Sequence, residues 1–353
     1  MVALALVVAS AVGALVAGCK AKGSGKPKVV VSIFPIYDLT RRIAGDRLEV
    51  VLVLPPGKSE HGYDPTPKEI ARLEGARLGV AVGLDLDAWV EGIMKSAGGV
   101  PRMVHLGQHV STLPIDVTPI GEDEAHDEHD GHDGHDDHDG HDGHDDHDDH
   151  DGHDDRVGKP AEPAKPAPGP AAPGDHAGHG HGARGAPDPH FWLDPQRAAR
   201  VVEVLVAELS TLDPGGAELF ARNGAALAAE LDELDARIEA RARTWSKRTI
   251  VTFHGSFTYY AARYGLRIAA VIEPLPGKEP TPQYVAEVLA AIRRGRAAAL
   301  FSEPQLDRRP AEVIAAEGKL PLGELDPVGG LPGRDSYAAL LGWNTEQLAK
   351  VLE

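Results

Sequence analysis

Histidines are the side chains of this chain with the clearest capacity to bind a metal ion, because neutral imidazole is a common metal ligand. Of the 18 histidines, ten recur within one acidic tract and three follow at positions 176, 179 and 181. The other five are His61, His105, His109, His190 and His254. His105 and His109 flank the end of an expected strand, and we interpret them as structural or surface residues. His61, His190 and His254 remain as candidate ligands.

The three candidates, together with Asp326, are expected on loops at the carboxyl ends of strands. His61 lies in SEHGYDPTP (59–67), His190 in DPHFWLDP (188–195) and Asp326 in ELDPVGG (324–330), while His254 directly follows an expected strand. Ligands of α/β proteins bind at these ends. Three imidazoles and one carboxylate suit Zn²⁺. The alternative for each histidine alone is an ordinary loop residue with satisfied hydrogen bonds.

The elements that must position these residues alternate between strand and helix. Strands are expected over 29–34, 48–54, 78–82, 102–106, 249–253, 266–272, 298–301 and 320–325. Helices are expected over 37–44, 67–76, 86–97, 195–212, 217–245, 257–264, 282–293, 310–317 and 336–352. Alternation of this kind predicts parallel sheets flanked by helices.

The chain is long enough for two domains. We predict an α/β fold of two Rossmann-like lobes, 28–212 and 246–353, joined by one long rigid helix within 213–245. About 29 helical residues would span roughly 43 Å. A polar and Pro-rich insertion over about 121–187 interrupts the first lobe, and its composition predicts disorder. A cleft between the lobes is then a natural ligand site.

The net charge of −18 comes from one acidic tract. Residues 122–155 hold 18 of the 54 Asp and Glu and no Lys or Arg, so the rest of the chain has 36 of each sign. No basic stripe remains for nucleic acid. The tract predicts a flexible, weak collector of Zn²⁺ that loses metal below about pH 6; the alternative is a solubilising spacer. Its histidines are His126, His129, His132, His135, His138, His141, His144, His147, His150 and His153.

Cys19 is the only cysteine, which excludes an internal disulfide framework and a cysteine-based zinc site. Residues 2–18 carry no charge and end in LVAGC, which resembles a bacterial lipobox. We therefore expect a signal peptide over 1–18, lipidation of Cys19 and a polar tether over 19–27. The mature protein would be extracytoplasmic and anchored to a membrane. A membrane-spanning anchor and a signal without lipidation are the alternatives.

Four motifs resemble a known family: EHGYDPTP, DPHFWLDP, VTFHGSFTYYAARYGL, and FSEPQL followed by GELDPVGG, in this order. They look like those of the metal-binding solute-binding proteins of ABC importers (cluster A-I), a family rich in lipoproteins, and particularly of its zinc-specific, ZnuA-like branch. The resemblance covers essentially the whole mature chain. It implies two α/β lobes bridged by a rigid helix, in agreement with the pattern of elements.

The resemblance also implies which residues bind the metal. The matching positions are His61, His190 and His254, with Asp326 as a fourth ligand in many members. Glu60 is a ligand or a near neighbour in some members. For Glu303 we expect either an acceptor that orients a ligand histidine or a surface role. Manganese and iron branches usually carry Glu at the third position, so His254 favours Zn²⁺.

We therefore expect a monomeric receptor that captures Zn²⁺ as its transported ligand and delivers it to an ABC permease. A manganese or iron homologue and a surface metal buffer or adhesin-like lipoprotein are the alternatives. A zinc hydrolase is disfavoured, because the chain lacks the HExxH and G-x-S-x-G motifs and Asp326 would close the site to water. We expect no enzymatic activity.

Overall fold

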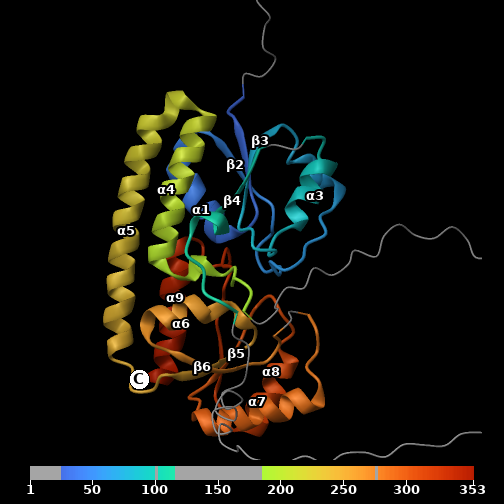
Figure 1. The fold of residues 1–353 in the computed structure, drawn as a ribbon, viewed down its shortest axis with the longest axis vertical. Helices are drawn as coiled ribbons and strands as arrows, with labels where there is room; N and C mark the ends of the chain where they lie inside the picture. Colours follow the sequence, from blue (N-terminus) through green and yellow to red (C-terminus); the bar gives the residue numbers. More distant parts are fainter. Residues whose placement is uncertain (1–24, 100–101, 116–184, 275–276) are drawn as a thin grey trace, which may run out of the picture.

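The computed structural model describes residues 25–99, 102–115, 185–274 and 277–353. They form two lobes, each built on a four-stranded parallel sheet with helices on its faces (Figure 1). The predicted fold class is confirmed. The predicted signal peptide, Cys19, most of the tether and the ten-histidine tract lie outside the described residues.

The two sheets have the same topology. The first contains β1 (Lys28–Val31), β2 (Glu49–Leu52), β3 (Ala76–Ala81) and β4 (Arg102–His105) in the order β2-β1-β3-β4. The second contains β5 (Thr249–Thr252), β6 (Arg267–Val271), β7 (Leu300–Ser302) and β8 (Leu322–Glu324) in the order β6-β5-β7-β8. All neighbouring strands pair in parallel. In each sheet the strand order therefore reverses beside the first strand, which is where α/β sheets place their ligands.

Helices cover both faces of each sheet. They are α1 (Phe34–Ala44), α2 (Pro67–Ala71), α3 (Trp89–Ser96), α4 (Pro195–Leu212), α5 (Ala217–Arg243), α6 (Thr258–Tyr264), α7 (Pro282–Gly295), α8 (Arg309–Gly318) and α9 (Tyr337–Leu352). Single turns of 3₁₀ helix include η2 (Leu106–His109), η4 (Phe191–Leu193) and η6 (Gly255–Phe257). The start of α4 follows from its sequence, because Asp194 caps the backbone N–H of Gln196 and Pro195 occupies the first turn.

Several element boundaries differ from the sequence prediction, including those of the first strand and the first two helices. The first strand ends at Val31 and α1 begins at Phe34, because Pro35 fits the first turn of a helix, where its missing N–H has no partner to lose. Helix α2 ends at Ala71 instead of 76. Gly75 takes a positive φ of 74° and Ala76 already pairs in the sheet.

The two lobes share one hydrophobic core. Val29 and Val31 on β1 belong to it, and Val30, which points to the opposite face, belongs to a smaller core under α3. The large core continues into the second lobe through Tyr260 of α6 and Leu348 of α9. A third core lies between the second sheet and helices α7 and α8. Packing through the large core opposes separation of the lobes as independent domains.

Helix α5 runs along both lobes (Figure 1). Its 27 residues correspond to roughly 40 Å, and it contacts α1 and α4 in the first lobe and α6 and α9 in the second. Its buried Asp235 accepts hydrogen bonds from Arg263 and Tyr264 of α6 and from Gln196 of α4. These hydrogen bonds hold α5 against both lobes, as expected for a rigid linker helix.

The chain on the two sides of the insertion is paired. The backbone N–H of Ile115 donates to Ala186 over 2.8 Å, and that of Asp188 donates to Leu113 over 2.8 Å. Residues 185–187, which we expected to be disordered, therefore belong to a short antiparallel stem. Within the part of the chain that the structure describes, no helix combines the length and apolar character needed to cross a membrane.

Candidate metal centre

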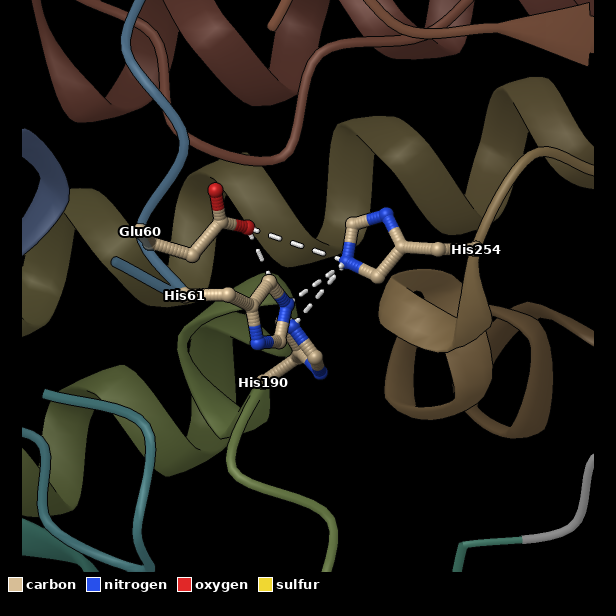
Figure 2. Close-up of side chains that lie close together, drawn as sticks. All are labelled: Glu60, His61, His190 and His254. Atoms are coloured by element: carbon tan, nitrogen blue, oxygen red, sulfur yellow. Dashed lines mark hydrogen bonds and ion pairs between the residues drawn. The ribbon is translucent and has the colours of Figure 1, made fainter. Parts of the chain in front are cut away.

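Four side chains with metal-ligating atoms meet between the lobes: Glu60, His61, His190 and His254. One ligand atom from each lies within 4.8 Å of those of the others. Glu60 and His61 come from the loop after β2, His190 from the turn before η4, and His254 from the end of β5, and the rings converge in Figure 2. The three histidines that the sequence singled out are therefore brought together.

The Nε2 atoms of the histidines have the spacing of ligands around one ion. His254 Nε2 lies 3.3 Å from Nε2 of His61 and 3.3 Å from Nε2 of His190. Two nitrogens bonded to a tetrahedral Zn²⁺ at about 2.0–2.1 Å lie about 3.3–3.4 Å apart. Glu60 Oε1 is somewhat farther away, 3.8 Å from Nε2 of His254 and 3.9 Å from Nε2 of His190.

The Glu60–His61 loop is held from the first lobe. The indole Nε1 of Trp89, at the start of α3, donates to the carbonyl oxygen of Glu60 over 3.0 Å. Farther along the loop, Thr66 and Glu69 form a capping box at the start of α2. Glu60 is only 1% exposed, whereas His61 is partly exposed. The loop thus directs a buried carboxylate and a more accessible imidazole towards the other lobe.

His190 is oriented by Asp188, two residues before it. Asp188 Oδ1 lies 2.8 Å from Nδ1 of His190 and also accepts the backbone N–H of His190 over 2.9 Å. A carboxylate at Nδ1 holds the proton of the neutral ring on that nitrogen. The lone pair of Nε2 is then available to a metal.

His254 has a corresponding partner in Glu303, which follows β7. Glu303 Oε2 lies 2.7 Å from Nδ1 of His254, and Oε1 accepts from the hydroxyl of Ser256 over 3.3 Å. Strands β5 and β7 are neighbours at the reversal point of the second sheet. Of the two roles considered for Glu303, an acceptor that orients a histidine agrees with this geometry, and a surface role does not, because Glu303 is buried.

The electrostatics of the group favour a cation. Burial raises the pKa of Glu60, although His254 and His190 oppose the increase. Burial lowers the pKa of His254, but the carboxylates of Glu303, Glu60 and Asp188 outweigh it and raise this pKa to about 9. Buried carboxylates next to the imidazoles therefore stabilise a positive charge there, either a proton or a metal ion.

Asp326 is not part of the group, contrary to our expectation of a fourth ligand. Its Oδ1 accepts hydrogen bonds from Gln305 and from the backbone of Val328 and Gly329, and its Oδ2 pairs with Arg334 over 3.1 Å. The carboxylate is thus neutralised by neighbours from its own lobe. The carboxylate that lies beside the three imidazoles is that of Glu60.

The other predicted residues lie elsewhere. His105 ends β4 and pairs with Glu91 over 3.2 Å, and His109 ends η2, so neither joins the group. Cys19 and the ten tract histidines lie outside the described residues. Asp188 was not among the predicted residues, although its position two residues before His190 in DPHFWLDP is a local signal for a side chain that folds back on the histidine.

The chain is similar to known metal-binding proteins. A family model described as "ZnuA: Zinc-uptake complex component A periplasmic" matches residues 29–351. The chain is 25% identical to the zinc-binding protein AdcA of Streptococcus pyogenes over 314 residues, which cover 89% of this chain and 53% of AdcA. The chain therefore spans about half the length of that relative.

Two further proteins are similar over most of their length. The iron ABC transporter substrate-binding lipoprotein MtsA of Streptococcus pyogenes is 25% identical over 346 residues, which cover 95% of this chain and 92% of MtsA. A crystal structure of ZnuA superposes with a TM-score of 0.68 at 22% identity, covering 93% of this chain and all of that chain. The structural similarity supports the two-lobed fold.

Proposed function

This chain belongs to the ZnuA family of zinc-uptake components, and from that premise we propose that it captures Zn²⁺ outside the cytoplasm and delivers it to an ABC-type permease. The observation that carries the proposal is the convergence of Glu60, His61, His190 and His254 between the two lobes. A site between two lobes suits a carrier, because ligands from both sides surround the ion, and a movement of the loop on one side opens the coordination and releases it.

We assign the ion to the Nε2 atoms of His61, His190 and His254, with the carboxylate of Glu60 as the fourth ligand in place of Asp326. The 3.3 Å spacings of the Nε2 atoms support this assignment. Glu60 lies farther out at 3.8 Å, so binding requires a small inward movement of its side chain. Four protein ligands would fill a tetrahedral zinc site.

The composition of the ligand set favours Zn²⁺ over Mn²⁺ or Fe²⁺. Three imidazoles and one carboxylate suit Zn²⁺, whereas Mn²⁺ prefers sites richer in carboxylate and carbonyl oxygen. AdcA is named as zinc-binding and MtsA as an iron-transporter component, so relatives of both kinds are similar to this chain in sequence. A closed set of four ligands also leaves no position for a catalytic water, which supports a binding protein instead of a zinc hydrolase.

Titration of the mature protein with Zn²⁺ in competition with a chelator tests this assignment. We expect one tight site, with His254→Ala lowering its affinity by more than about 100-fold, because groups that only orient a ligand contribute roughly 10- to 100-fold. His105→Ala is the matched control, since His105 pairs with Glu91 outside the group. Unchanged affinity in His254→Ala would refute the site. Tighter binding of Mn²⁺ or Fe²⁺ than of Zn²⁺ would refute the proposed cargo.

We further propose that the protein is attached to the outer face of a membrane through lipid on Cys19. The LVAGC motif and the lipoprotein name of MtsA support this. Cys19→Ser is expected to move the protein from the membrane fraction to the soluble extracytoplasmic fraction of expressing cells. Cell fractionation measures the change, and a variant that stays in the membrane fraction would contradict lipid anchoring.

A further inference from the structure

His190 belongs to the first lobe by its place in the chain, yet the segment around it is also held by the second lobe. The hydroxyl of Tyr259 on α6 donates to the carbonyl oxygen of Asp188 over 2.6 Å. The hydroxyl of Tyr337 on α9 donates to the carbonyl oxygen of Trp192 over 2.6 Å. Trp192 in turn donates from Nε1 to the carbonyl oxygen of Pro327 over 2.7 Å. Three hydrogen bonds therefore fix the ends of the segment 188–192 to the second lobe.

Asp188 transmits this attachment to the imidazole. Tyr259 holds its backbone carbonyl, and its carboxylate accepts hydrogen bonds from both the backbone N–H and Nδ1 of His190. Two hydrogen bonds therefore connect Tyr259 to the ring of His190: one from the Tyr259 hydroxyl to the carbonyl of Asp188, and one from Nδ1 of His190 to the carboxylate of Asp188. A shift of the Asp188 backbone would turn the ring of His190 and move its Nε2 away from Nε2 of His254.

Tyr259 is itself held firmly. It is fully buried, the guanidinium of Arg197 lies 4.7 Å from its ring centroid, and its hydroxyl accepts the backbone N–H of Leu113 over 3.0 Å. Burial raises the pKa of Tyr259 to about 12, so the hydroxyl keeps its proton and donates at neutral pH. It therefore bridges both strands of the stem of the insertion, at Leu113 and at Asp188.

We infer that Tyr259 is a positioning residue for the metal ligand His190 and that, with Tyr337, it makes His190 and His254 one preformed pair on the second lobe. Tyr259 lies five residues after His254 and is separated from it only by η6 and the start of α6. The short stretch from His254 to Tyr259 thus supplies one proposed ligand, His254, and holds the other, His190, in place. The inference rests on the proposed metal site.

Glu60 and His61 form the other half of the site. Their loop is held by Trp89 in the first lobe. The metal centre therefore divides into two halves: a two-histidine half fixed by the second lobe, and a half of one carboxylate and one histidine fixed by the first. An arriving ion would bind the paired histidines in their existing geometry, and approach of the other loop would complete the coordination.

Tyr259→Phe tests the inference, because it removes the hydroxyl and retains the ring. Tyr260→Phe is the matched control: Tyr260 is equally buried, and its hydroxyl bonds to Thr345 over 2.8 Å, away from the metal group. We expect Tyr259→Phe to weaken Zn²⁺ binding by about 10- to 100-fold, with altered visible absorption bands of the Co²⁺-loaded protein. Tyr260→Phe should leave both unchanged.

A double-mutant cycle separates positioning of His190 from a general structural role. In the His190→Ala background, Tyr259→Phe should cause no further loss of Zn²⁺ affinity. The same fold-loss in both backgrounds, or equal losses in Tyr259→Phe and Tyr260→Phe, would overturn the inference. Should Tyr259→Phe fail to fold without metal, Tyr337→Phe decides the question in the same cycle: coupling to His190 supports the inference and its absence overturns it. A wild-type protein without tight Zn²⁺ binding would instead refute the proposed function.

Discussion

At the scale of single residues, the centre depends on carboxylates that hold the histidines in place. Asp188 and Glu303 each lie within 2.8 Å of an Nδ1 atom. In its neutral form each ring therefore keeps its proton on Nδ1 and directs the lone pair of Nε2 towards the common point between the rings. Glu60 lies on the Nε2 side of the rings. Two carboxylates thus orient the proposed ligand histidines, and the third lies where it could bind the same ion.

Binding of Zn²⁺ should release a proton from this group. The pKa of His254 is about 9, so at pH 7.5 the metal-free ring is protonated and the ion must displace that proton. We expect affinity to rise with pH up to about 9, by about tenfold per pH unit for one proton. Calorimetry in buffers of different ionisation enthalpy counts the protons released. Glu303→Gln should release fewer, and a buffer-independent enthalpy for the wild type at pH 7.5 would contradict the prediction.

The same pKa predicts the opposite trend for the metal-free fold. Because the pKa of His254 is raised from 6.5 to about 9 in the folded state, the protonated ring stabilises the fold. This contribution is fully present below about pH 6.5 and is lost as the pH rises through about 9. Metal-free protein should therefore lose thermal stability over that range while its affinity for Zn²⁺ increases.

At the scale of elements, the close contact of α4 with α5 positions the segment that carries His190. A Cβ on Gly224 of α5 would lie 2.4 Å from Cγ2 of Val206 on α4. The two helices can approach this closely because Gly224 has no side chain, and Val206 has little rotamer freedom in a helix. Helix α4 begins five residues after His190, so its placement bears on the ligand.

Gly224→Ala should destabilise the protein by about 1–3 kcal/mol, the usual cost of overpacking. Gly342→Ala in α9 is the control, since nothing lies within 4 Å of a Cβ at that position. There, the higher helix propensity of Ala should stabilise by up to about 1 kcal/mol. Denaturant unfolding of both variants measures the difference. Equal effects of the two substitutions would show that α4 and α5 do not depend on this contact.

At the scale of the whole molecule, the acidic tract is an insertion on a paired stem. Leu113 and Ile115 pair with residues 186–188, so the chain closes on itself before His190. The net charge of −18 reflects this tract, and the rest of the chain has equal numbers of acidic and basic residues. The charge of the chain as a whole therefore belongs to one segment, outside the group of four proposed ligands.

Deletion of residues 122–155 should leave the tight Zn²⁺ site intact and remove several weak ones. The stem and all four proposed ligands remain in that variant, and the tract histidines are expected to bind weakly and exchangeably. Zinc titration with thermal unfolding measures both effects. Loss of the tight site, or a large decrease in stability, would show that the tract takes part in the fold or in the centre.

Much of the molecule follows from its sequence alone. Strand and helix periodicity predicted both sheets and the long helix α5, because those patterns reflect local geometry and burial. Helix α4 was predicted to the residue, since Asp194 and Pro195 mark its start by chemistry that acts within one turn. The candidate histidines were identifiable because each lies at the carboxyl end of a strand or in a distinct motif.

Which of these residues come together depends on tertiary packing. Asp326 and Glu60 were both candidate carboxylates, and the structure pairs Asp326 with Arg334 while it places Glu60 beside the imidazoles. It also shows Tyr259 bound to Asp188, 71 positions away in the chain. Residue types and local periodicity determine what a segment can form and which chemistry it carries. The distance between side chains remote in sequence depends on how the lobes pack, and that packing determines which candidate ligands lie together.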